Sequence, residues 1–144
     1  MNEKNKKNEY FLVTIPANGL RLNAGRMESK PITLKTLQSE VGGLVEAVAI
    51  REPIKGLEML DAFVNEDGID AGLSLNMAAT MLLKHPIFGN LVLCRYSQDG
   101  NSYPLSREEL DRLADIMGGL VKSFCEWAEN RANVEEEKGI FREV

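Results

Sequence analysis

The segment that follows Ser106 places the strongest constraint on how this chain can fold. Ser106 and Glu109 have the spacing of a capping box, in which each side chain bonds the backbone N–H of the other residue at a helix start. Apolar residues then recur at helical spacing, at positions 110, 113, 114, 117, 121, 124 and 128. The pattern predicts a long C-terminal helix over residues 106–131. One face of this helix is apolar and needs a surface to cover.

Two adjacent glycines, Gly118 and Gly119, lie in the middle of the predicted helix. Together they cost about 2 kcal/mol of helix stability relative to two alanines. Two interpretations stay open: the pair marks a kink, or it marks a place where another backbone comes close.

The remaining apolar segments are shorter and predict a sheet. Four of them are rich in β-branched or other apolar residues and are bounded by turn residues, as is typical of strands. These segments are 10–15, 44–50, 59–64 and 91–96. Thr33 and Asn76 are N-caps of two short helices, which end at Gly42 and before Pro86. Residues 20–31 show no clear preference. We therefore predict an α+β fold: a mostly antiparallel sheet of about four strands, with two short helices and the long helix packed on it.

Length and composition indicate one domain. A chain of 144 residues with 44% hydrophobic and 27% charged residues can bury a core without metals or disulfides. We assign this domain to residues 10–131. Residues 1–9 are polar and unpatterned, and residues 132–144 contain an acidic run. Both are expected to be solvated tails, flexible at the N-terminus and acidic at the C-terminus.

Charge and cysteine content narrow the class of protein. The net charge is −5 and the basic residues are scattered, which argues against a nucleic-acid partner. No apolar run is long enough to cross a membrane, and no secretory signal core is present. Cys94 and Cys125 form no CxxC motif and are interpreted as buried free thiols in a reducing compartment. We expect a soluble protein in the cytoplasm of a bacterial host cell.

Several motifs in the middle of the chain resemble a domain family found in phages and mobile elements, domain of unknown function 3846. They are Leu34-x-x-Leu37-Gln38-x-x-Val41-Gly42-Gly43-Leu44-Val45-Glu46, Val64-Asn65-Glu66-Asp67-Gly68, Leu75-Asn76-x-x-Ala79-Thr80 and Gly89-Asn90-Leu91-Val92-Leu93. The resemblance covers about residues 32–96, and the long helix lies beyond it. It implies a phage or mobile-element origin and no particular reaction, because the family has no assigned chemistry.

No catalytic or metal-binding motif stands out. His85 is the single histidine, and its place before Pro86 favours a helix-end cap over a catalytic base. One histidine and two distant cysteines do not make an ordinary zinc site. We therefore predict no catalytic residues, no metal and no cofactor.

Six polar residues are candidates for ligand contact. Glu46 lies on a strand face where an apolar residue is expected, so it is either solvated at an edge or held against a partner. Asn65 and Glu66 open a predicted hairpin turn in which Gly68 supplies a positive φ; cation binding is the alternative. Asn76 and Thr80 begin a helix whose N-terminus is a candidate anion site, with a plain N-cap as the structural alternative. Arg51 adds a positive charge in the loop after the second strand.

The end of the long helix carries the candidate oligomer contacts. Phe124, Trp127 and Arg131 lie where the sheet is expected to end, so this part of the helix has no surface of its own chain to cover. A homodimer through these residues is predicted.

The sequence favours a binding protein over an enzyme. The first hypothesis is a non-enzymatic phage or mobile-element accessory protein that binds a ligand or host factor. One form of this hypothesis is that the ligand is a nucleotide-like defence signal, which the protein sequesters. The second is a protein–protein interaction module for the element's own replication or maintenance. The third is a hydrolase or transferase that uses carboxylates such as Glu46, Glu66 or Asp67.

Overall fold

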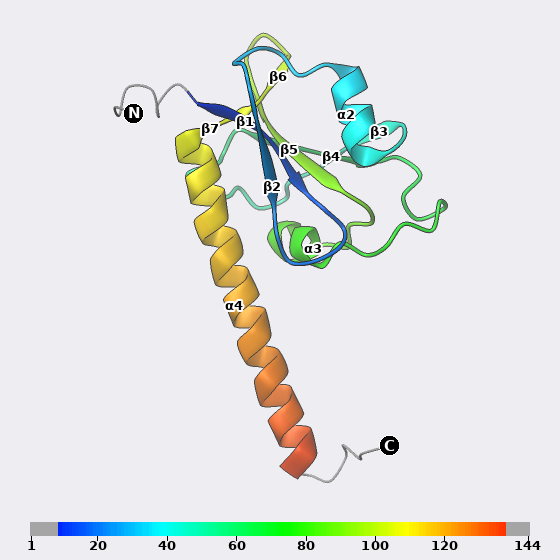
Figure 1. Ribbon diagram of the computed structural model, residues 1–144, viewed down its shortest axis with the longest axis vertical. Helices are drawn as coiled ribbons and strands as arrows, with labels where there is room; N and C mark the ends of the chain where they lie inside the picture. The colour runs from blue at the N-terminus through cyan, green and yellow to red at the C-terminus, as the bar shows by residue number, and fades with distance from the viewer. Residues whose placement is uncertain (1–8, 138–144) are drawn as a thin grey trace.

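The computed structural model describes residues 9–137 and consists of one antiparallel sheet with helices on both faces (Figure 1). The elements in chain order are β1 (Tyr10–Ile15), β2 (Asn23–Met27), α2 (Leu34–Val41), β3 (Val45–Val48), β4 (Leu60–Asn65), α3 (Met77–Leu83), β5 (Leu91–Tyr96), β6 (Ser102–Tyr103), β7 (Leu105–Ser106) and α4 (Arg107–Glu137). The predicted α+β class is confirmed, with its two short helices and its long C-terminal helix.

The sheet has seven strands where about four were predicted. Its main path has the order β2-β1-β5-β4-β3, while β6 pairs with β5 and β7 with β1. β2, β6 and β7 are the strands that the sequence pattern did not reveal. β2 lies at one edge with four of its five residues exposed, so it carries no apolar alternation. β6 and β7 have two residues each and lie on either side of Pro104, which makes them too short for a periodic signal.

Two cores lie on opposite faces of the sheet. The larger core contains Val13, Ile15 and Leu93 from the central strands, together with Leu82 of α3 and Leu113 of α4. The smaller core packs α2 against the other face. It is formed by Ile32, Leu37, Val41, Val92 and Cys94, with Val45 and Phe63 partly buried at its border. The sheet is therefore a middle layer, and its strands alternate between the two cores.

The helix ends match the caps expected from the sequence. The hydroxyl of Thr33 accepts from the backbone N–H of Thr36 at 3.2 Å, and α2 ends at Gly42 with a φ of 74°. At the start of α4, the Ser106 hydroxyl accepts from the Glu109 N–H at 3.1 Å, while the Glu109 carboxylate accepts from the Ser106 N–H at 2.9 Å. The capping box is thus confirmed in both directions.

α4 begins beside β7 and runs past the end of the sheet (Figure 1). It has 31 residues and continues to Glu137, so residues 132–137, which were assigned to the acidic tail, are helical. α4 continues through Gly118 and Gly119, and a methyl group added at either glycine would meet no atom within 4 Å. Among the described residues, no other backbone comes close to this pair.

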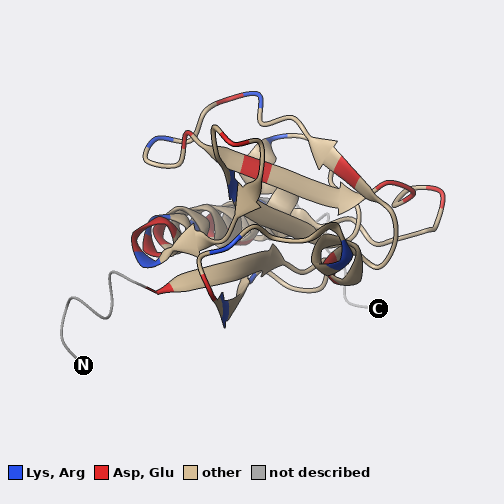
Figure 2. Ribbon diagram, turned by 90° about the horizontal axis from the view of Figure 1, so that it is seen from above, with Lys and Arg blue, Asp and Glu red and all other residues tan. Residues whose placement is uncertain are grey.

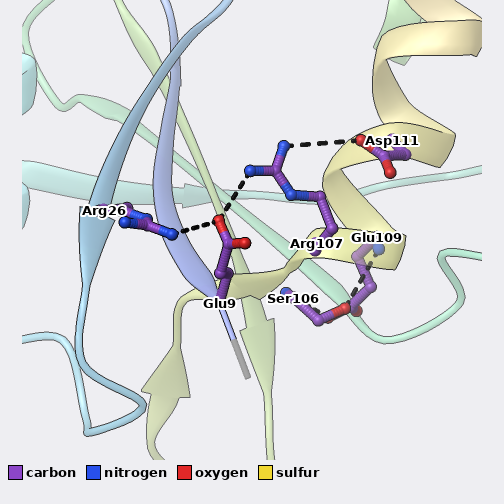
Figure 3. Close-up of polar contacts among 6 residues, drawn as sticks. All are labelled: Glu9, Arg26, Ser106, Arg107, Glu109 and Asp111. Carbon is purple, nitrogen blue, oxygen red and sulfur yellow. Dashed lines mark hydrogen bonds and ion pairs between the residues drawn. The ribbon is translucent and has the colours of Figure 1, made fainter. Parts of the chain in front are cut away.

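Glu9 joins the start of β1 to β2 and α4. This residue, assigned to the N-terminal tail, is buried, and its carboxylate pairs with Arg26 at 2.7 Å and with Arg107 at 2.8 Å (Figure 3). Arg107 also approaches Asp111 at 3.9 Å and lies over the ring of Phe11. Glu9 is therefore part of the folded domain. The rest of the predicted tail, residues 1–8, lies outside the described residues.

Candidate functional site

A pocket of about 460 Å³ opens beside the edge strand β3. Three stretches of chain line it: residues 46–49 and 51 of β3 and the loop after it, residues 64–70 at the end of β4 and beyond, and residues 85–88 after α3. We call this concavity the acidic pocket. Its ionisable lining residues are Glu46, Arg51, Glu66, Asp67, Asp70 and His85.

β3 reaches this position because it is the last strand of the sheet. Glu46 pairs with Val64 of β4 in the antiparallel register, so the two side chains lie on the same face. Val64 is buried, whereas Glu46 is exposed at the outer edge. The structure thus has the solvated-edge arrangement, one of the two alternatives for Glu46.

The loop after β4 is held by a side-chain cap and a close backbone contact. The buried Asn65 accepts from the backbone N–H of Asp67 at 2.8 Å and donates to the carbonyl of Val41 at 3.2 Å. The N–H of Gly68 donates to the carbonyl of Asn65 at 3.2 Å. These bonds turn the chain sharply, which directs the carboxyl-bearing residues 66, 67 and 70 to one wall of the pocket.

Two details of this turn differ from the sequence prediction. The turn does not close a hairpin, because β4 pairs with β3 and β5 and the chain continues from the turn toward α3. Gly68 does not have a positive φ. Space favours a glycine there instead: a Cβ would lie 3.0 Å from the carbonyl oxygen of Phe88, which also lines the pocket, so the backbone of a neighbour would have to shift.

The third wall begins where α3 ends. Lys84 adopts the left-handed conformation with a φ of 61° and closes the helix, and Pro86 follows. His85 is half-buried in this segment and lines the pocket. Ile87 in the same segment is buried and also lines the pocket, so this wall combines apolar surface with an ionisable group.

No ion pair joins any of the six ionisable groups of the pocket within residues 9–137. Carboxylates outnumber Arg51 four to one among them. Elsewhere, basic and acidic residues are interspersed over the elements of the ribbon (Figure 2). The pocket is therefore a concave surface with an excess of negative charge, and no ion pair within the described residues neutralises it.

Four of the six candidate ligand residues line this one pocket: Glu46, Arg51, Asn65 and Glu66. Asn76 and Thr80 lie apart from it and have structural partners. Asn76 is fully buried; its amide donates to the carbonyls of Ile15 and Gly89 and accepts from the N–H of Ala79. The Thr80 hydroxyl accepts from the N–H of Ile87 at 3.0 Å. Asn76 thus acts as an N-cap and as a bridge from α3 to the sheet.

Asp67, Asp70 and His85 are pocket residues that the candidate set omitted. Asp67 was considered for a hydrolase and His85 for a helix cap. Asp70 carried no sequence signal. Its place in the pocket follows from the turn at Asn65, which a local pattern does not specify in three dimensions.

The described part of the chain holds no cluster of three or more metal-ligating side chains and no helix long and apolar enough to span a membrane. The two cysteines differ in environment. Cys94 is buried in the smaller core, as predicted, and burial followed by the Asp61 charge raises its pKa to about 12. Cys125 is exposed, which corrects the prediction of two buried thiols. It belongs to the second half of α4.

The distal part of α4 carries the three candidate oligomer residues. The rings of Phe124 and Trp127 stack with centroids 6.1 Å apart, and 61% of Trp127 is exposed. Arg131 is exposed one turn further along the helix. All three therefore lie on the same stretch of helix, and the Trp127 ring is largely uncovered by the described chain.

A family model described as a domain of unknown function (DUF3846) matches residues 18–118 of the chain. The chain belongs to this family. The DUF3846 match extends the resemblance of residues 32–96 in both directions. It includes β2 and the first part of α4, which the sequence analysis placed outside the family. Comparison with curated proteins and with solved structures found no match.

The DUF3846 match contains every wall of the acidic pocket and ends at Gly118. The exposed Trp127 lies beyond its end. The pocket is therefore a feature of the family domain in this chain, whereas the distal part of α4 lies outside the matched region.

Proposed function

We propose that this chain is a non-enzymatic binding protein whose ligand site is the acidic pocket. The observation that supports this proposal is the gathering of six ionisable side chains, unpaired within the described chain, around one concavity. A volume of about 460 Å³ is in the range of small-ligand pockets. Ile87 provides buried apolar surface, and the polar lining groups can orient a ligand, as is usual in small-ligand sites.

The charge of the lining favours a cationic ligand group. Glu46, Glu66, Asp67 and Asp70 would repel phosphate oxygens, and Arg51 is the one lysine or arginine among the described residues that line the pocket. An ammonium or guanidinium group would instead find carboxylate acceptors on two walls. The nucleotide-like ligand considered from the sequence is therefore a weaker candidate for this pocket than an amine or guanidine.

The biological setting in this proposal is that of an accessory protein of a phage or mobile element, which acts on a host factor in the cytoplasm. The resemblance of the sequence to phage and mobile-element domains supports that setting. In this role the protein would act by binding its ligand and keeping it from other partners, since the proposal includes no chemical conversion.

A protein–protein interaction module is the second candidate, and the open edge of β3 favours it. The exposed Trp127 on the distal part of α4 supports a homodimer as part of the same candidate. Replacing Trp127 with Ser would then convert the dimer to a monomer in size-exclusion chromatography with light scattering. A wild-type monomer would contradict this part of the proposal.

A carboxylate-based hydrolase is the third candidate. His85 lines the same pocket as the acidic residues, but no hydrogen bond joins it to a carboxylate within residues 9–137. A general base is normally oriented by such a bond. This arrangement gives the hydrolase less support than the binding function.

The binding proposal can be tested by NMR titration of the ¹⁵N-labelled full chain. The probes are N-acetyl-arginine amide, spermidine and ATP. We expect the two cations to shift the amide signals of residues 66–70, 85, 87 and 88 in a saturable way, and ATP to leave them unchanged. Mass spectrometry should recover each probe unaltered.

Paired substitutions link the signal to the pocket. The double variant Glu46→Gln/Glu66→Gln should weaken cation binding about fivefold or more, which corresponds to the loss of about 1 kcal/mol of charge interaction. Glu126→Gln, on the exposed distal part of α4, is the matched control and should have no effect. The proposed site would be overturned if ATP were the one probe to shift the signals, or if none of the three probes shifted them. Turnover of a probe would overturn the non-enzymatic assignment.

A further inference from the structure

The outer edge of β3 carries backbone groups that no other strand of the described residues pairs. β3 is the last strand in the sheet order, and it pairs only with β4 among the strands of the described chain. The carbonyl of Leu44 accepts from the Glu66 N–H at 2.8 Å, which sets the phase of the ladder. In antiparallel pairs the bonded residues alternate, so Glu46 and Val48 bond to β4. Val45 and Ala47 consequently direct their N–H and C=O groups away from the sheet.

The acidic pocket runs along this same edge. Residues 46–49, which include most of β3, form one of its walls. A strand that bonded to Val45 and Ala47 would extend the sheet by one position, and its alternate side chains would lie on the pocket face. Backbone pairing and side-chain insertion into the pocket are therefore compatible in one bound segment.

The charge of the acidic pocket indicates which kind of strand could add to the β3 edge. Glu46 lies on the pocket face of β3, and Glu66, Asp67 and Asp70 belong to the neighbouring wall. Opposite charges on facing strands stabilise pairing, and like charges destabilise it. The β3 edge of a second copy would bring the same four carboxylates to the interface. A segment with lysine or arginine at alternate positions would meet them with complementary charge.

We infer that this chain binds an extended, basic segment of another protein by strand addition to β3, with lysine or arginine side chains of that segment in the acidic pocket. This inference rests on the proposed function of the pocket and names its class of partner. The edge supplies main-chain hydrogen bonds, and the pocket supplies specificity for basic side chains.

The test uses capped peptides of about seven residues, long enough to span one strand. The first peptide alternates threonine and lysine, and the second alternates threonine and glutamate. The third repeats the threonine–lysine sequence with alternate backbone amides N-methylated, which removes one edge of hydrogen-bond donors and keeps the charge. Hydrogen exchange and chemical shifts of the ¹⁵N-labelled full chain are followed with each.

We expect the threonine–lysine peptide to slow exchange at the Val45 and Ala47 amides, and to leave Glu46 and Val48 unchanged because these are already bonded to β4. N-methylation should weaken binding about tenfold or more, and the glutamate peptide should not bind. Glu46→Gln/Glu66→Gln should weaken the lysine peptide, with Glu126→Gln as the control. No variant needs to disturb the sheet, since the methylated peptide tests the backbone contact from the ligand side.

Other results would overturn the inference in distinguishable ways. If the lysine and methylated peptides bind equally and no amide gains protection, the pocket binds cations without strand addition, and the proposed function survives alone. If spermidine, N-acetyl-arginine amide and the peptides all fail to bind, the proposed function fails as well. Equal binding of the glutamate peptide would refute the role of charge. Protection of Val45 and Ala47 in a protein-only dimer would identify a second copy as the occupant.

Discussion

The carboxylate of Glu9 accepts a hydrogen bond from the guanidinium of Arg107 at 2.8 Å, across 98 positions of the sequence (Figure 3). Arg26 of β2 pairs with the same carboxylate at 2.7 Å. The first strand, its edge neighbour and the start of the long helix thus meet at one buried acidic group. The hydrogen bond from Arg107, followed by that from Arg26, lowers the pKa of Glu9 below its ordinary value.

This lowered pKa predicts a pH-dependent stability. Because Glu9 has a lower pKa in the folded chain than in the unfolded chain, its contribution is fully present above the unfolded value and is lost as pH falls through the folded value. Glu9→Gln should therefore lower the urea midpoint at neutral pH, and its difference from wild type should shrink below about pH 4. Glu126→Gln is the exposed control. A difference that stays constant down to acid pH would contradict the assigned ion pairs.

Asn76 predicts a stability loss larger than that of an ordinary helix cap. Asn76→Ala removes the cap and the two hydrogen bonds that the buried amide donates to the carbonyls of Ile15 and Gly89, at a cost of about 3 kcal/mol. Asn76→Asp keeps the acceptor and should not restore stability. Thr33→Ala, which removes the exposed cap of α2, is the matched control and should cost about 1 kcal/mol. Urea unfolding measures all three. Full rescue by Asp would show that capping alone matters.

The elements with strong local signals were predictable from the sequence. The capping box at Ser106 and Glu109, the glycine stop at Gly42 and the apolar strands each depend on neighbouring residues, and all are present. β2 was not predictable, because its residues are mostly exposed and its pairing with β1 supplies the structure that its own composition does not favour. Glu9 was misassigned for a similar reason: both of its partners lie far away in the sequence.

The site was predictable only in part, because it forms where three separate segments meet. Glu46 could be singled out as a charge on an otherwise apolar strand, and Glu66 as part of a turn. That both lie beside His85 depends on β3 being at the sheet edge and on α3 ending at Lys84. For Asn76, the sequence pattern suggested more than the structure supports. A polar residue at a helix start suggested a ligand site, whereas its amide is fully used by the fold.

The two cysteines predict a selective alkylation pattern. Cys94 is fully buried and its pKa is raised to about 12, so neither access nor ionisation favours reaction. Cys125 is exposed on α4. Iodoacetamide at about pH 8 should therefore modify Cys125 alone in the native chain and both thiols after unfolding in urea. Peptide mass spectrometry identifies the modified residue. Rapid native labelling of Cys94 would show that the smaller core opens readily.

The glycine pair in α4 predicts a gain in stability on substitution. Both residues are exposed within the helix, neither has a positive φ, and an added methyl group would meet no atom within 4 Å. Gly118→Ala and Gly119→Ala should each stabilise the chain by about 1 kcal/mol in urea unfolding. Gly42→Ala is the control, because its φ of 74° makes the same substitution destabilising. If both α4 variants lost stability, the helix would not run continuously through the pair, and a kink, one of the two interpretations of the sequence, would be the better account.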